Sequence, residues 1–120
     1  MSVNFTKFDG LGRMLGSGSC PKDILNLQAQ VGERVIEGEY APLSVWLDPL
    51  GNVKPRTATS ATLSGNVISG ITLPARAIIN NVCHELTSPT LPCTFSYAGS
   101  YDVIIDPVSE LPKTFTVIQP

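Results

Sequence analysis

The chain has 120 residues, of which 8 are basic and 10 acidic, for a formal net charge of -2. This balance lacks the basic surface that phosphate backbones require, so we expect no nucleic-acid partner. Only 15% of the residues are charged, which is low for a small soluble monomer and predicts that part of the surface meets other protein.

The sequence shows no targeting or membrane segment. No positively charged stretch followed by an apolar run opens the chain, so we expect no secretory signal and a protein made in the cytoplasm. The apolar runs are much shorter than the ~18 residues that a spanning helix needs. We therefore expect no membrane span.

The cysteines do not form the pattern of a disulfide framework. Cys20, Cys83 and Cys93 are odd in number and irregular in spacing, which favours reduced, mostly buried thiols. A bridge between Cys83 and Cys93 stays open as an alternative, because strand pairing could bring the two together.

The front of the chain predicts a hairpin. Val3 to Asp9 alternates apolar and polar residues, Gly10-Leu11-Gly12 supplies a turn, and Arg13 to Ser17 can return as a second strand. Gly16 to Ser19 has the composition of a linker. Pro21 to Gln28 follows, which predicts either a helical turn or an extended segment.

Three short strands and two connections are expected next. Arg34 to Glu39 and Leu43 to Asp48 have strand character, and Pro49 to Asn52 carries the residues of a turn. Val53 to Arg56 predicts an edge strand, because Pro55 has no backbone donor for a central ladder. Thr57 to Ser64 is either a polar loop or a solvated strand.

The remainder of the chain is a series of short apolar runs. They recur at about the 8 to 12 residue interval of strands in a sandwich or barrel, and none is long enough for a crossover helix. Antiparallel pairing is the consequence. The runs are Val67-Ile68, Ile71 to Leu73, Ala77 to Ile79, Val82-Cys83, Phe95 to Tyr97, Tyr101 to Ile105 and Thr114 to Ile118.

The last two runs give the clearest prediction. Tyr101 to Ile105 and Phe115 to Ile118 are joined by a proline-containing loop, so they can lie antiparallel, with either Val103 or Ile104 pointing inward. The sequence thus predicts an all-β fold, an antiparallel β-sandwich preceded by an N-terminal hairpin or extended arm. We expect the arm in residues 1–20 and a single globular sandwich domain in residues 21–120.

The front half resembles a known family. Ser19-Cys20-Pro21, Leu27 to Gln30 and Gly32 to Glu39, after an opening strand and turn, are similar to the start of small structural proteins of tailed bacteriophages, which are tail or tail-fibre proteins.

The rear half resembles the Ig-like half of the same proteins. There a Pro-Gly-x-Tyr turn precedes the penultimate strand, where this chain has Ala98-Gly99-Ser100-Tyr101. The resemblance implies an Ig-like sandwich. It is carried further by Leu73-Pro74, Ile78 to Asn80, Tyr101 to Ile105 and Thr114 to Val117.

We expect the N-terminal arm to contact a neighbouring protein. Edge pairing supplies main-chain hydrogen bonds without special side chains, and residues 1–20 are tethered through a glycine-rich segment. The hypothesis is that this arm docks on another subunit or another virion protein. Its predicted interface residues are Val3, Phe5, Phe8, Leu11, Met14 and Leu15.

No metal or nucleophile site is predicted. Cys83, His84, Glu85 and Cys93, with Cys20, match no common zinc spacing, so an ordinary strand-end histidine is the simpler interpretation of His84. Neighbouring residues of a strand point to opposite faces, which also separates Cys83 from His84 as nucleophile and base.

We expect structural roles for the carboxylates of the rear half and for the single tryptophan. Asp102, Asp106, Glu85 and Glu110 could suggest a glycosidase pair. However, they occupy turn and outward-strand positions, and a domain this small has little room for a substrate cleft. Trp46 is expected to pack in the core rather than stack on a sugar. We predict no catalytic, cofactor-binding or metal-binding residue and no cofactor.

The expected function follows from the resemblance. It implies a bacteriophage virion structural protein, tail-associated in the fibre, baseplate or connector region, assembled in the host cytoplasm, whose partners are other virion proteins and copies of itself. The alternatives are a capsid decoration protein and a module that binds a host-surface glycan. An enzyme is not expected.

Overall fold

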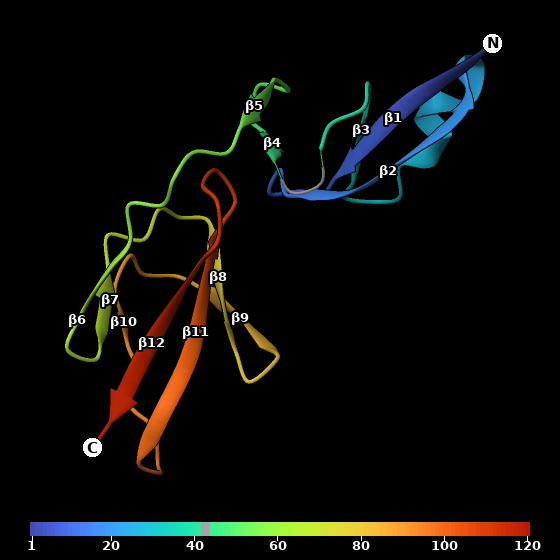
Figure 1. The fold of residues 1–120 in the computed structure, drawn as a ribbon. Helices are drawn as coiled ribbons and strands as arrows, with labels where there is room; N and C mark the ends of the chain where they lie inside the picture. Colours follow the sequence, from blue (N-terminus) through green and yellow to red (C-terminus); the bar gives the residue numbers. More distant parts are fainter. Residues whose placement is uncertain (42–43) are drawn as a thin grey trace. The chain divides into compact units, whose positions relative to one another are not determined.

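The computed structural model describes residues 1–41 and 44–120 and is drawn in Figure 1. Strands make up 53% of it and helix 6%. All the pairings between its strands are antiparallel. The all-β, sandwich-like fold class expected from the sequence is confirmed.

The chain divides into two compact units, Met1–Arg56 and Thr57–Pro120. The sequence placed the boundary after residue 20 instead. The reason for the difference is that the first strand lies in the middle of a sheet, where Phe5 pairs with Glu37. Residues 1–20 are therefore built into the first unit.

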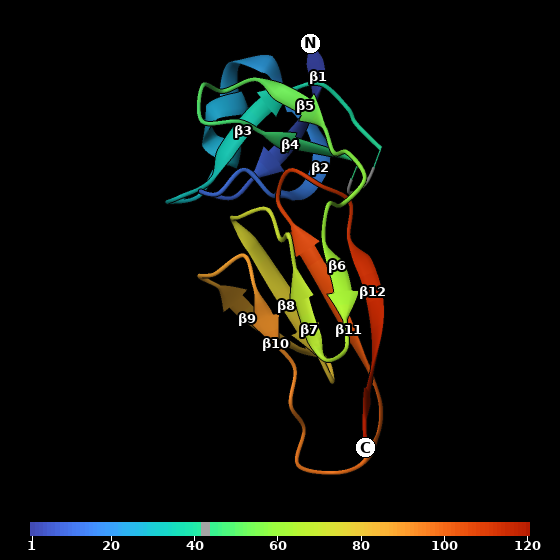
Figure 2. The same cartoon turned by 90° about the vertical axis from the view of Figure 1, so that its left-hand side faces the viewer.

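Unit 1 contains two small sheets and one short helix, seen clearly in Figure 2. The three-stranded sheet has the order β2-β1-β3, and the two-stranded sheet pairs β4 with β5. The helix, η1, is of the 3-10 type and has no buried residue. The bounds are β1 Ser2–Phe8, β2 Met14–Pro21, η1 Lys22–Gln28, β3 Arg34–Glu37, β4 Val45–Leu47 and β5 Val53–Pro55.

The hairpin turn joins the two sheets of unit 1. Gly12 has φ of 93°, a conformation that glycine adopts without strain. Its carbonyl accepts a hydrogen bond of 2.9 Å from the Leu47 amide, and a Cβ on Gly12 would collide with the Leu47 carbonyl. Phe8, Met14 and Leu47 then form the core between the sheets.

The expected linker at Gly16 to Ser19 is wrong, because these residues belong to β2. Each pairs with a residue of β1, and Gly18 lies opposite Phe5. A Cβ built on Gly18 would lie 3.0 Å from the Phe5 ring. The aromatic ring thus covers the glycine, which compensates for the low strand propensity of that residue.

The other predictions for unit 1 differ mainly in their bounds. The segment after Pro21 is helical rather than extended. The strand expected at Leu43 to Asp48 is β4, which spans Val45–Leu47; Leu43 itself lies outside the described residues.

Unit 2 is a sandwich of a four-stranded sheet, β12-β11-β8-β9, and a three-stranded sheet, β10-β7-β6. The chain makes the β6–β7 pair, crosses to β8 and β9, returns with β10 beside β7, and crosses again to β11 and β12 (Figure 1). The bounds are β6 Thr62–Ser64, β7 Val67–Ser69, β8 Ala75–Ile79, β9 Val82–Leu86, β10 Leu91–Pro92, β11 Gly99–Pro107 and β12 Lys113–Gln119.

The core of unit 2 lies between the two sheets. Val103 and Ile105 are fully buried, whereas Ile104 between them lies on the outer face and is half-buried. Val103 is therefore the inward residue of the pair that the sequence left open. The antiparallel pairing predicted for the last two runs is confirmed. The buried set is Ala61, Ile68, Ile71, Ala75, Ala77, Cys93, Val103, Ile105, Phe115 and Val117.

Two expected strands of unit 2 are wrong. Ile71 to Leu73 and Phe95 to Tyr97 lie outside any strand, and β10 was not predicted. The Phe95 ring stacks on Tyr101 at a centroid distance of 3.8 Å, and the Tyr101 hydroxyl donates a 2.8 Å hydrogen bond to the Tyr97 carbonyl. The alternating aromatic residues Phe95 and Tyr97 thus belong to a turn that packs on Tyr101, and their spacing resembled that of a strand.

We predict that Val103→Asp unfolds unit 2, because a carboxylate without a partner in this core costs several kcal/mol. Hydrogen exchange of peptides from β8, β11 and β12 measures the effect. Val82→Asp, at a 54% exposed position of β9, is the control and should leave their protection unchanged. Native protection in Val103→Asp would contradict the core assignment.

Candidate interaction surface

The six residues predicted to form an interface divide into two groups. Phe5, Phe8 and Met14 are at most 9% exposed and lie in the interior of unit 1. Val3 is half-buried, and Leu11 and Leu15 are about half exposed. Of the predicted set, Leu11 and Leu15 offer the most side-chain surface to a partner.

The hairpin leaves one edge of its sheet open. β2 is the end strand of β2-β1-β3, and among the described residues no strand pairs with its outer edge from Gly16 to Cys20. The edge is not open at the start of β2, because Arg13, the residue before this strand, forms an isolated β-bridge with Trp46. The open part presents main-chain donors and acceptors that another strand can use.

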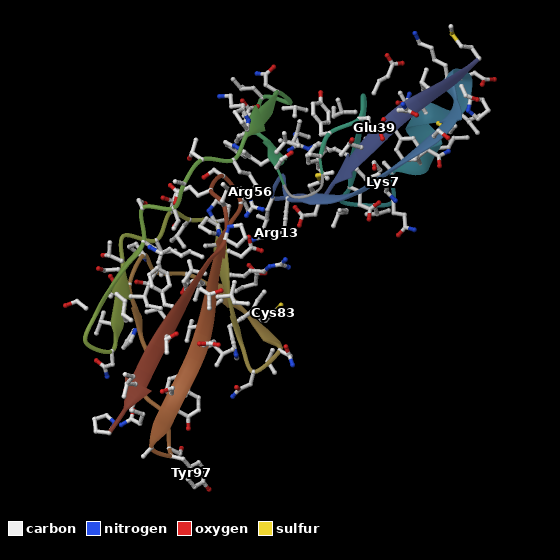
Figure 3. The ribbon with its side chains drawn as sticks, in the orientation of Figure 1. Lys7, Arg13, Glu39, Arg56, Cys83 and Tyr97 are labelled. Carbon is white, nitrogen blue, oxygen red and sulfur yellow. The ribbon has the colours of Figure 1, made fainter. Side chains whose placement is uncertain are left out.

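The open part of the β2 edge carries no charge. Natural edge strands are commonly blunted by charged side chains, yet β2 contains none between Arg13 and Lys22. By contrast, β3 has Arg34 and Glu37 at its two ends. On the central strand β1, Nζ of Lys7 lies 3.0 Å from Oε1 of Glu33. Lys7 is labelled in Figure 3.

A β-bulge explains why Leu15 faces solvent. Lys7 pairs with Gly16 and Phe8 pairs with Met14, so Leu15 is the extra residue of β2. A bulge redirects the side chain of the inserted residue. Leu15 is 51% exposed as a result, beside the buried Met14.

More apolar side chains of unit 1 are exposed around the helix. η1 contacts β1, β2 and β3 but buries none of its own residues. Leu27 is 77% exposed, and Ile24 and Val31 are exposed as well. Leu11, Leu15, Ile24, Leu27 and Val31 are thus exposed apolar residues of unit 1 that a partner could cover.

Asp48 stabilises the turn that follows β4. Asp48 Oδ1 accepts hydrogen bonds from the amides of Asn52 at 2.8 Å and Leu50 at 3.0 Å, and Lys54 lies 3.1 Å from Oδ2. The Asn52 amide, with help from Lys54, lowers the pKa of Asp48 below its ordinary value. Asp48 is therefore a turn-forming residue.

Three of the carboxylates of unit 2, Asp102, Asp106 and Glu110, also have structural partners. Asp106 lies 3.0 Å from the Arg76 guanidinium, and Glu110 accepts a 2.8 Å hydrogen bond from the Thr72 hydroxyl. Asp102 accepts one of 3.0 Å from Thr116. Each of these three carboxylates therefore has a structural role that involves no substrate.

The thiols and the histidine do not assemble a site in the described part of the chain. No cluster of three or more His, Cys, Asp or Glu residues there could hold a metal ion. Cys20, Cys83 and Cys93 are free, with Cys83 exposed and the other two buried. Figure 3 shows Cys83 on β9, and burial raises the pKa of Cys93.

An open hollow of about 380 Å³ lies on the outer face of the four-stranded sheet. It is lined by Asn80, Asn81, Asp102 and neighbouring residues. Tyr101 contributes to the lining, but its ring is stacked on Phe95. The hollow therefore offers polar groups without an aromatic platform.

Trp46 is half-buried and alternates with Val45 and Leu47, which contact the core of unit 1. It does not belong to that core, so the expected core role is wrong. Alternation places its ring on the opposite face of β4.

The comparisons with known proteins give no relative. No family model, no curated protein and no solved structure matches the chain. Among the described residues, no helix has the length and apolar character needed to cross a membrane. The site must therefore be judged on its geometry.

We predict that unit 1 loses stability in acid partly through Asp48. Because the folded pKa of Asp48 is lowered, its contribution is present above the ordinary value of 3.8 and is lost as pH falls through the lower folded pKa. Trp46 fluorescence during urea unfolding at several pH values measures this. Asp48→Asn should flatten the dependence, whereas Asp23→Asn, on exposed η1, should not; equal slopes would contradict the assignment.

Proposed function

We propose that this protein is a structural assembly component of a bacteriophage virion, associated with the tail and acting through contacts with other virion proteins and with copies of itself. The observation that carries the proposal is the open, uncharged outer edge of β2. Its virion setting rests on the family resemblance of the sequence. It would be assembled in the host cytoplasm.

The physical argument concerns how an edge recruits a partner. A strand added to an open edge gains main-chain hydrogen bonds, and the flanking side chains provide specificity. Leu15, held outward by the bulge, and Leu11 in the turn lie at one end of the edge. A partner strand would bury these apolar groups while pairing with Gly16 to Cys20.

Unit 2 supports the Ig-like part of the resemblance. A tyrosine at the start of a strand whose hydroxyl bonds back to the chain a few residues upstream is a feature of Ig-like sandwiches. Tyr101 near the start of β11 does this with the Tyr97 carbonyl. We propose that unit 2 is an Ig-like domain that holds its shape during assembly.

The contacts of the carboxylates in unit 2 favour a role in assembly over a role in catalysis. The carboxylates considered for glycoside cleavage include Asp106 and Glu110, which are engaged by Arg76 and by Thr72. A general acid needs a carboxyl that is available to substrate. We accordingly propose no enzyme activity and no cofactor.

A host-surface glycan module is the second candidate. The hollow beside Asn80, Asn81 and Asp102 has polar groups suited to sugar hydroxyls. Sugar sites commonly add an aromatic face, and the nearest ring, Tyr101, is stacked on Phe95. The hollow is thus a weaker basis than the open edge. A capsid decoration protein would use the same edge and differs only in location.

The test is incorporation into particles. Ser17→Lys places a charge in the middle of the β2 edge, and we expect it to reduce the amount of the protein in purified particles at least about tenfold, measured by quantitative mass spectrometry. Leu50→Lys, an 87% exposed turn position in the same unit, is the control.

Either of two results would contradict the proposal. One is absence of the wild-type chain from purified particles. The other is full incorporation of Ser17→Lys. Deleting residues 2–18 is less informative, because it removes β1 from the middle of its sheet and would unfold unit 1.

A further inference from the structure

A second edge is open in unit 2. β12 is the end strand of β12-β11-β8-β9, and within the described residues only β11 pairs with it. Thr114, Thr116 and Ile118 are exposed along it, and Ile118 is 67% exposed. Figures 1 and 2 show β12, in red, at the margin of its sheet.

The residues of β12 favour pairing. From Thr114 to Gln119 the strand has no charge and no proline, and its Thr, Phe, Val and Ile residues have high strand propensity. The opposite margin of the sheet, β9, contains His84 and Glu85. β12 is thus the less protected of the two margins.

The strand is complementary to a second copy of itself. In an antiparallel pair centred on Thr116, Thr114 faces Ile118 of the second copy and Phe115 faces Val117. β-Branched and aromatic pairs of this kind stabilise adjacent strands. The one charged residue, Lys113, then faces the neutral Gln119, so no like charges meet.

We propose that β12 pairs with β12 of a second copy, joining two four-stranded sheets into one sheet around a two-fold axis. The partner is a copy of this chain because the centred register matches every residue of β12 with a compatible one. A two-fold contact requires that kind of self-complementarity. The inference goes beyond the proposed function, since it holds whether or not the protein belongs to a virion.

Pairing in this way would also cover the exposed apolar part of β12. Ile118 would lose part of its contact with water against Thr114 of the second copy. On the other side, Phe115 and Val117 already lie on the core face of each sandwich. The two cores would then meet along the joined strands.

Thr116→Lys is the variant that tests the proposal. It sets two lysines opposite each other at the centre of the pair, and we expect dimer dissociation to become at least about tenfold easier in analytical ultracentrifugation. The monomer should tolerate the change, because Asp102 on β11 lies directly opposite position 116, where it accepts a hydrogen bond from the Thr116 hydroxyl and could pair with a lysine. Circular dichroism verifies folding.

Two more variants make the result specific. Ile118→Lys should also weaken the dimer, and it serves if Thr116→Lys fails to fold. Val82→Lys puts the same charge at a 54% exposed position of β9 and should leave the dimer unchanged. Ser17→Lys, on β2 of unit 1, should leave it unchanged as well.

Three results would overturn the inference. The first is a wild-type protein that stays monomeric up to about 1 mM. The second is a dimer that neither Thr116→Lys nor Ile118→Lys weakens although both variants fold. The third is a dimer that is lost in Val82→Lys or in Ser17→Lys but not in the β12 variants. A solution dimer with these β12 effects, from a chain absent from particles, would contradict the virion proposal and support this inference.

Discussion

The structure depends on the constraint that an open antiparallel sheet has two edges. Each unit is small, so each core is made by a few inward residues, Phe8, Met14 and Leu47 in unit 1 and the set around Val103 in unit 2. The sheets do not close into barrels. β2 has no charged residue and β12 has none from Thr114 to Gln119, whereas charges usually protect end strands. We propose that these edges are the surfaces through which a chain with only 15% charged residues contacts its partners.

The strands most accurately predicted from the sequence are those with strict alternation and a local partner. β11 and β12 are neighbours along the chain, and the inward positions of Val103 and Val117 follow the two-residue period. The predicted linker at Gly16 to Ser19 failed because the sequence does not show that Phe5 covers Gly18. The glycine and serine composition alone predicts a flexible segment there, whereas the contact between Phe5 and Gly18 makes it part of a strand.

The surface was less predictable than the fold. Phe8 and Met14 looked available on an isolated hairpin, but they pack against Leu47, which is more than thirty residues away. Long-range contacts of this kind have no local signature. The absence of charge in β2 and from Thr114 to Gln119 of β12 is visible in the sequence. It becomes informative only once the sheet order shows which strands are at the margins.

The most direct test of the central claim is residue-resolved hydrogen exchange of the main-chain amides as protein concentration rises. If exposed backbone is what joins copies of the chain, the β12 amides that point away from β11 gain protection with concentration, and those of β9 do not. Exchange at β12 that stays equally fast at every concentration, while the protein associates, would show that another surface makes the contact and would contradict the account.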